Sequence, residues 1–445
     1  MKKILQKIGC SQLLHHSISI FSGITPKSGG DAYCDKNDGI PFIRSGDFLE
    51  DGKINFDDLL YIKHSIHNGI MKGSKVKKND LLMAIVGATI GKVGIYKDDR
   101  ESNINQAIAA VRLRSSLTPE YARAFLLTSL GQKVIDRIKR PVARANINLE
   151  EVGTLNIPNL SISEQNKIVK VMDAAYSAKK EKEAEAERLL NSIDDYLLRE
   201  LGIELPEQEE NTVQSRIFTR RFSEISGGRF DPNFFQPYFK ELTSSIRTVS
   251  YGTLGHIAKF SNETWNQQDL FTKTFPYIEI GEIDLAFGEV KNISYVNIKE
   301  APSRAKMIVR GGDIVLSTTR PSRGAIVRIA DTEDIFIAST GFSIIRKVIN
   351  PSVTPSYLFH ILRSAISLKQ MEQRSSGGNY PAITQEELEK VIIPIPPLPK
   401  QTEIADHITQ IRNNAKQLQQ EAKQGLEQAK QEVEAMILGE DHSDV

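Results

Sequence analysis

The chain has 445 residues, a length that predicts two or three domains. Its 57 basic and 56 acidic side chains leave a formal net charge of +1, so the total charge does not favour a nucleic-acid partner. A hydrophobic content of 40% and a charged content of 25% argue against a disordered chain. No apolar run reaches the roughly 18 residues of a membrane span, and Cys10 and Cys34 are too few for a disulfide framework. We therefore expect a soluble protein of a reducing, intracellular compartment.

Charge is unevenly distributed along the chain. Residues 1–160 carry about +7, residues 161–210 about −6, residues 211–399 about +4 and the remaining residues about −4. Two basic segments therefore alternate with two acidic segments that are poor in glycine. Chance segregation of charge onto solvated helix faces gives the same pattern. Charge alone therefore does not decide whether the alternation of basic and acidic segments reflects function or chance.

The chain repeats itself once, at an offset of about 235 residues. Five blocks recur in the same order, beginning with PFIRSGDF at 41–48 and PYIEIGEI at 276–283. The second block aligns Asp80 with Asp313. The other three blocks start at 103, 118 and 146 in the first copy and at 337, 354 and 382 in the second. A period this long predicts a duplicated domain rather than a solenoid.

Each copy contains mostly short predicted strands. Runs such as LLMAIVGA, KVGIY and AIAAVRL are rich in strand-forming residues and are bounded by Gly, Asp or Asn. A helix is predicted after Thr118 and after Thr354, because each is an N-cap residue followed by proline. A second short helix is predicted near Asn148 and Thr384, where a glutamate three residues later completes a capping box. Each copy is therefore expected to be an α+β domain.

A long helix is predicted after each copy, at 163–201 and at 400–438. At 1.5 Å per residue each helix would be about 55 Å long. Because neither helix could leave its apolar stripe in water, we expect the two to form an antiparallel coiled coil with one domain at each end. Helices that dock on other subunits instead are the alternative. The predicted stripes are Ile168, Val171, Ala175 and Ala178, then Leu189, Ile193 and Tyr196, in the first helix, and Ile404, Ile408, Ile411, Ala415, Leu418, Ala422, Leu426, Ala429, Val433 and Met436 in the second.

This order of elements resembles the specificity (S) subunit of Type I restriction-modification systems over nearly the whole chain. The resemblance is carried by IVGATIGKVGIY at 85–96, the Asn105-Gln106-Ala107 turn, and the stretches at 147–169 and 375–405. Its most specific part is a strand end of the Ile-Pro type, followed by Glu-Gln or Lys-Gln and a long helix. The second copy departs from the first in having TTRPSRG where the first has GATIG.

The resemblance implies an α+β fold with two similar α/β target recognition domains, separated by two long helices that form an antiparallel coiled coil with a pseudo-two-fold internal repeat. The implied parts are target recognition domain 1 at 1–160, a spacer helix at 161–205, target recognition domain 2 at 206–398 and a second spacer helix at 399–440.

The function that the resemblance implies is sequence recognition without catalysis. One domain would bind each half of a split, asymmetric target in double-stranded DNA, and the chain would recruit two methylation (M) subunits and also restriction (R) subunits. S-adenosylmethionine, ATP and Mg would be bound only by those partners, in a bacterial or archaeal cytoplasm, with no membrane. The alternatives are a coiled-coil scaffold without DNA binding, a recognition subunit of a methylation-only complex, and an enzyme with an unrecognised site.

Candidate DNA-binding residues come from polar clusters at matching places in the two copies. Lys and Arg suit phosphates, while Arg and Asn can also read base edges. The candidates are Lys63, His67, Asn68, Lys72, Lys75, Thr89, Lys92, Arg140, Arg144, Asn146, Arg304, Lys306, Arg320, Arg323, Arg374, Asn379 and Tyr380.

No catalytic or metal-binding residue is predicted. The sequence has no Gly-x-x-x-x-Gly-Lys-Ser/Thr loop, and DPNF at 231–234 lacks the second proline of the amino-methyltransferase motif. His64 and His67 lack two further ligands in a recognisable pattern, so we expect them to be ordinary surface histidines.

Overall fold

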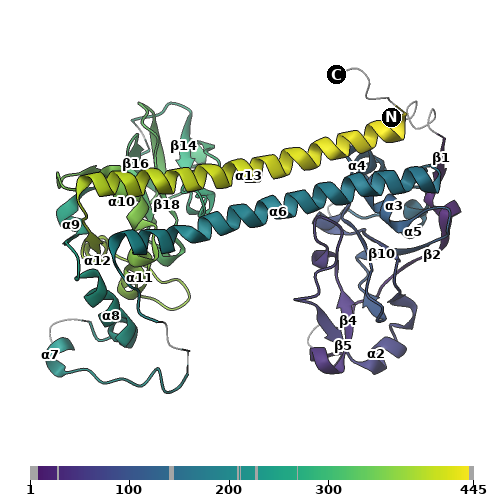
Figure 1. Ribbon diagram of the computed structural model, residues 1–445, viewed down its shortest axis with the longest axis horizontal. Helices are drawn as coiled ribbons and strands as arrows, with labels where there is room; N and C mark the ends of the chain where they lie inside the picture. Colours follow the sequence, from purple (N-terminus) through teal and green to yellow (C-terminus); the bar gives the residue numbers. More distant parts are fainter. Residues whose placement is uncertain are drawn as a thin grey trace. The chain divides into compact units, whose positions relative to one another are not determined.

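The computed structural model describes residues 9–27, 30–139, 145–207, 210, 212–225, 229–267 and 269–439. The chain divides into two compact units: the first comprises Met1–Glu183 with Gln419–Val445, and the second comprises Ala184–Leu418. Both divisions fall inside long helices, so each unit contains a section of both (Figure 1). In the part of the chain that the structure describes, no helix is long and apolar enough to cross a membrane.

The first unit is built on a four-stranded antiparallel sheet of order β2-β10-β7-β8 and a five-stranded sheet of order β3-β5-β4-β9-β6. In the second sheet β4 and β9 are parallel. A short pair, β1 with β11, completes the unit. The strands are β1 Cys10–Gln12, β2 Ser17–Ser22, β3 Tyr33–Cys34, β4 Ile40–Ile43, β5 Leu60–Ile62, β6 Lys75–Val76, β7 Leu81–Ala84, β8 Val93–Ile95, β9 Ser102–Ile104, β10 Ile108–Leu113 and β11 Asn156–Pro158.

The second unit repeats this topology. Its antiparallel sheet has the order β13-β20-β17-β18, its other sheet has the order β15-β14-β19-β16 with β14 parallel to β19, and β12 pairs with β21. The internal repeat predicted from the sequence is therefore confirmed as a repeated fold. The strands are β12 Tyr251–Thr253, β13 Ala258–Ser261, β14 Thr274–Ile278, β15 Ser294–Asn297, β16 Ala305–Arg310, β17 Ile314–Ser317, β18 Ile326–Arg328, β19 Ile335–Ser339, β20 Phe342–Val348 and β21 Ile392–Pro394.

The short helices start where the capping residues predict. Thr118 Oγ1 accepts a hydrogen bond from the backbone N–H of Tyr121, and Thr354 caps the equivalent helix in the same way. Asn148 and Glu151 form the expected capping box. Several helices were not predicted; among them, α4 (Ser129–Asp136) and α11 (Ala365–Arg374) each start only a few residues after the preceding helix ends. The helices are α2 His64–Asn68, α3 Pro119–Leu126, α4 Ser129–Asp136 and α5 Leu149–Gly153, then α7 Phe222–Ile225, α8 Pro237–Ile246, α9 Leu254–Ile257, α10 Pro355–Leu362, α11 Ala365–Arg374 and α12 Gln385–Glu389.

The two long helices are α6 (Ile162–Leu201) and α13 (Leu398–Leu438), close to the predicted bounds. In the first unit, Ile168 and Met172 of α6 join Val433 and Ile437 of α13 in the main apolar core. Lys182 pairs with Glu421 at 2.5 Å further along. Because residue numbers rise along α6 as they fall along α13, the helix sections run antiparallel (Figure 1).

The second unit shows the same antiparallel pairing with other residues. The rings of Tyr196 and His407 lie 4.1 Å apart between centroids, and Glu200 pairs with Lys400 one turn further along. Ile404 and Ile408 are fully buried in the core of this unit, as the predicted seam requires.

Parts of the predicted stripes were wrong. Ala178 is exposed, and Met172 is buried between the predicted positions. At the end of α13, Ile437 is 2% exposed and occupies the core position that was assigned to Met436. The stripe of a helix that packs on a sheet domain and on a second helix is wider than the heptad seam, so a single-seam assignment shifts by one residue at such places.

A buried glutamine fastens the start of each long helix to its own unit. Gln165 Oε1 accepts a hydrogen bond from the backbone N–H of Thr118 at 3.0 Å, and Gln165 Nε2 donates to the carbonyl oxygens of Ser116 and Leu160. Gln401 makes the same three bonds to Thr354, Ser352 and Pro396. The Glu-Gln and Lys-Gln pairs in the sequence therefore mark a structural anchor.

Candidate nucleic-acid interface

In the first unit, three loops are fastened together at one end of the antiparallel sheet. The backbone N–H of Ile85 donates to the carbonyl oxygen of Ala107 at 2.9 Å, and that of Ile147 donates to Ile85 at 2.9 Å. The N–H of Gly87 donates to Ala145 at 3.1 Å. We call residues 85–89, 105–107 and 145–147 the first loop edge.

The second unit makes the same three bonds. Thr318 N–H donates to Gly341 at 2.8 Å, Ile383 N–H donates to Thr318 at 2.9 Å, and Arg320 N–H donates to Pro381 at 2.7 Å. We call residues 318–323, 339–341 and 376–383 the second loop edge. Because these backbone bonds recur while the side chains differ, the two loop edges present different chemistry on one common frame.

The second loop edge brings together several residues selected from the sequence. Arg320 Nη2 donates to the carbonyl oxygen of Asn379 at 2.8 Å, and the Arg320 guanidinium carbon lies 4.5 Å from the centroid of the Tyr380 ring. Tyr380 is 72% exposed, and Arg323 is also exposed. A cationic, aromatic and amide-rich surface of this kind suits a nucleic acid, because it offers phosphate contacts, base stacking and hydrogen bonding together.

Arg304 adjoins the same edge, because its carbonyl oxygen accepts a hydrogen bond from Thr340 N–H at 2.8 Å. Its side chain is exposed. Lys306 is also exposed but lies one step into β16, where it lines a cavity of about 470 Å³ with Trp265 and Gln267.

The first loop edge carries fewer described charges. Asn146 is exposed and bridges to Val86, and Thr89 Oγ1 donates to the carbonyl oxygen of Val86 at 3.2 Å. Gln106, which the candidate residues did not include, lies on this edge and accepts a hydrogen bond from Thr25. Arg140 and Arg144, two of the predicted contacts, lie outside the described residues.

The lysines of the other first-unit cluster are largely paired with carboxylates. Lys63 pairs with Asp31, and Lys75 contacts Glu101 at 3.4 Å while donating to Asn68 Oδ1 at 2.8 Å. These pairs reduce the positive charge that the sequence cluster suggested. Lys72 is exposed in the turn before β6, and the antiparallel pairing of β6 with β9 places the start of β6 beside the end of β9.

His67 is not a surface residue, so neither interpretation of it from the sequence was right. It is 4% exposed, its Nδ1 lies 2.5 Å from Asn103 Oδ1, and its Nε2 lies 3.2 Å from Glu101 Oε2. With both ring nitrogens engaged inside the unit, His67 holds α2 against β9 and is not available for a direct DNA contact.

Arg374 is likewise occupied within its unit. Its side chain is 16% exposed, and Nη1 lies 3.1 Å from Glu387 Oε2. Burial lowers the pKa of this guanidinium, while Glu387 opposes the change. This ion pair joins α11 to α12. Because Glu387 already pairs with its charge, Arg374 is removed from the candidate interface.

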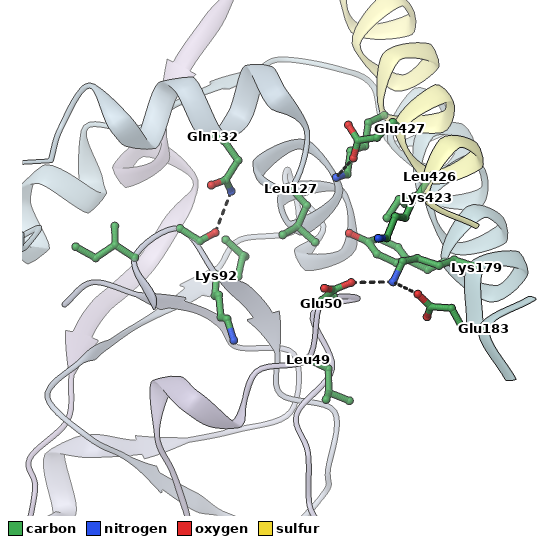
Figure 2. A pocket seen from close by; sticks show the side chains of 15 residues that line it. Leu49, Glu50, Lys92, Leu127, Gln132, Lys179, Glu183, Lys423, Leu426 and Glu427 are labelled. Carbon is green, nitrogen blue, oxygen red and sulfur yellow. Dashed lines mark hydrogen bonds and ion pairs between the residues drawn. The ribbon is translucent and has the colours of Figure 1, made fainter. Parts of the chain in front are cut away.

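Lys92 lines a cavity of about 600 Å³ in the first unit (Figure 2). Its Nζ donates to the carbonyl oxygen of Phe48 at 3.3 Å. In the same cavity the ammonium of Lys179 lies 2.8 Å from both Glu50 and Glu183. The hydrogen bond from Lys179 holds the pKa of the Glu50 carboxyl below its usual range. Because its lysines lie among glutamates, this cavity is not counted as part of the candidate interface.

The fold is a duplicated α+β arrangement in which each unit contains an antiparallel helix pair and one exposed loop edge. The family described as type I restriction modification DNA specificity domain matches residues 20–188 and 247–428. The chain belongs to this family, as the resemblance predicted.

Sequence relatives agree with that assignment, and a solved structure agrees with the fold. The chain is 33% identical over 144 residues to the type I restriction enzyme EcoBI specificity subunit of Escherichia coli, and 30% identical over 131 residues to the HindI specificity subunit of Haemophilus influenzae. These matches cover 30% and 28% of the relatives' own lengths. A chain from a structure concerning complex assembly and conformational transition of the type I R-M system matches with a TM-score of 0.52, at 14% identity and 98% coverage of both chains. That likeness supports the fold.

Proposed function

We propose that this specificity-family chain reads a split, asymmetric sequence in double-stranded DNA, with one half-site bound by each unit. The observation that carries the proposal is the duplicated loop edge, held by the same three backbone hydrogen bonds in both units. A common frame with different side chains is what two half-sites of different sequence require. Arg320, Arg323, Asn379 and Tyr380 would contact the half-site of the second unit.

The long helices would set the gap between the half-sites and would hold the partner subunits. In this proposal two methylation subunits and the restriction subunits supply catalysis, together with S-adenosylmethionine, ATP and Mg. The chain itself carries out no catalytic step and works where its DNA lies, in the cytoplasm of a bacterium or archaeon. A methylation-only complex differs from this proposal only in lacking the restriction subunits.

Methylome sequencing tests the proposal directly. Cells would express the full chain together with its candidate methylation partner, with a strain lacking the chain as the control. We expect adenine methylation at a two-part motif with a fixed gap, present only when both proteins are expressed. A continuous palindromic motif, or methylation that does not depend on this chain, would contradict the proposal.

A length change in the helices tests the spacer role. Seven residues inserted after Glu183 in α6, together with seven inserted after Leu418 in α13, preserve the heptad register. Two added turns lengthen each helix by about 10 Å, which corresponds to about three base pairs. We expect the gap in the methylated motif to grow by that amount while both half-sites stay the same.

The matched control replaces exposed residues around the insertion points without changing the length, and the gap should then stay constant. Altered half-site bases at constant spacing would exclude the spacer role.

A further inference from the structure

Arg320 occupies a backbone conformation that suits glycine. Its φ is 48° and its ψ is 54°, in the left-handed region, where a Cβ atom crowds the following carbonyl group. The equivalent residue of the first unit is Gly87, with φ 75°. The N–H of each residue makes the same bond to the neighbouring loop, to Ala145 in one unit and to Pro381 in the other. The frame therefore requires the left-handed conformation at this position in both units.

Stability alone does not explain an arginine here. Glycine adopts this conformation without steric cost, as it does at Gly91 and at Gly324, where both units retain glycine. A strained residue that persists on an exposed loop points to a role for its side chain.

The Arg320 side chain is held in one orientation but is not satisfied. The guanidinium carbon lies over the Tyr380 ring, 4.5 Å from its centroid, and the carbonyl oxygen of Asn379 accepts one hydrogen bond from Nη2. Among the described residues no carboxylate forms an ion pair with Arg320. Since a guanidinium has five N–H donors in one plane, most of them remain available for a ligand while these two contacts hold the group in place.

Two parallel donors in a fixed plane match the O6 and N7 acceptors that guanine presents in the major groove. Gly377 and Gly378 adjoin the pair, and a Cβ atom at Gly378 would meet no atom within 4 Å, so the backbone there faces open space. We propose that Arg320, positioned by Tyr380 and Asn379, reads a guanine in the half-site of the second unit. The inference rests on the proposed function and adds the residue and the base.

The test compares methylomes produced by the complete complex with wild-type chain, Arg320→Gly and Arg323→Ala. In the wild-type motif one position of the second half-site should be guanine. Arg320→Gly should reduce the preference for guanine at that position by about 10- to 100-fold, while the first half-site and the gap stay unchanged. Arg323→Ala removes an equal charge from the same loop and should lower methylation equally at all sequences.

Arg320→Gly also separates recognition from folding. Because glycine relieves the left-handed strain, the melting temperature of the second unit should rise or stay constant while base preference falls. Tyr380→Phe, which keeps the ring, should retain the guanine preference, and Tyr380→Ala should weaken it.

If Arg320→Gly lowers methylation equally at all second half-site sequences, with no change in base preference, Arg320 contacts a phosphate and the inference is overturned. An unchanged methylome would also overturn it. A wild-type complex that methylates no split motif would instead refute the proposed function.

Discussion

The two units share their backbone connections but differ where the domain meets the long helices. In the first unit, Arg123 of α3 pairs with Asp173 of α6 and donates to the carbonyl oxygen of Asp51 at 3.1 Å. In the second unit the position of Arg123 is Phe359, and Arg363, one turn later, donates to the carbonyl oxygens of residues 285–287. In both units an arginine therefore contacts the same loop of the domain. The arginine lies within α3 in the first unit and one turn later, at the end of α10, in the second.

The different arginine positions also change the residues beside the long helix in the second unit. Leu127 and Tyr176 line the cavity of the first unit, and the equivalent positions in the second unit are Arg363 and Arg412. Arg412 Nη1 donates to His360 Nδ1 at 2.7 Å, so the histidine proton lies on Nε2, which faces Thr409 Oγ1 at 3.1 Å. The duplicated bonds therefore define the fold, and the differing side chains give each unit its own electrostatics.

The largest effect is expected where the two units are most alike. Gln165→Leu and Gln401→Leu each remove the hydrogen bonds of a buried amide to one backbone N–H and two carbonyl oxygens, so each should lower the free energy of unfolding of its unit by about 4 kcal/mol. Hydrogen exchange followed by mass spectrometry separates the units by their peptides. Unequal losses would show that the shared anchor does not carry equal weight.

Buried ion pairs should separate the units. Asp80 accepts two hydrogen bonds from Arg112, at 2.9 and 2.7 Å, whereas Arg346 lies 2.8 Å from Asp313 without hydrogen-bond geometry and also contacts Glu263. Asp80→Ala should therefore cost about 3 kcal/mol and Asp313→Ala about 2 kcal/mol, because Arg346 keeps a second carboxylate. Urea unfolding monitored by peptide-resolved exchange measures both. An equal cost would contradict the ranking.

Acid should destabilise the second unit through His360. Burial, with the charges of Arg412 and Arg363, lowers the pKa of this histidine from 6.5 to about 3. The unfolded chain binds a proton near pH 6.5 and the folded unit does not, so stability is full above that pH and is lost as pH falls toward 3. At pH 5 the loss should be about 2 kcal/mol.

The control for this effect is His360→Ala. Alanine already occupies the equivalent position of the first unit, Ala124 in α3. The variant should remove the pH dependence of the second unit between pH 7 and 5. A slope that persists in the variant would assign the acid sensitivity to other groups.

The smallest effect is expected at the starts of α4 and α11. Glu434 Oε1 accepts from Leu130 N–H at 2.6 Å, and Asp194 Oδ1 accepts from Ala365 N–H at 3.0 Å. Replacing either carboxylate by alanine should cost about 1 kcal/mol, seen as faster exchange in the first turn of the capped helix. Asp195→Ala, at an exposed neighbouring position, is the control and should leave α11 unchanged.

The sequence by itself determined the duplication, the α+β character of each copy and the long helices. These features rest on local signals: a repeat in residue order, Thr-Pro caps at Thr118 and Thr354, and apolar spacing of three and four residues. It also selected most of the second loop edge, since Arg320 and Asn379 stood out as polar residues at matching places in the repeat.

Tertiary structure alone decided which of the selected residues are available. His67 is bound by Glu101 and Asn103, and Arg374 is bound by Glu387, so neither is free to contact DNA. A charge count along the chain does not reveal these partners. Tertiary structure also placed Arg320 beside Tyr380, about sixty residues away, in a conformation that only the repeated backbone frame imposes. The reason is physical: a side chain's exposure and pairing depend on residues that folding brings near, whereas helix caps and apolar periods depend on residues a few positions apart.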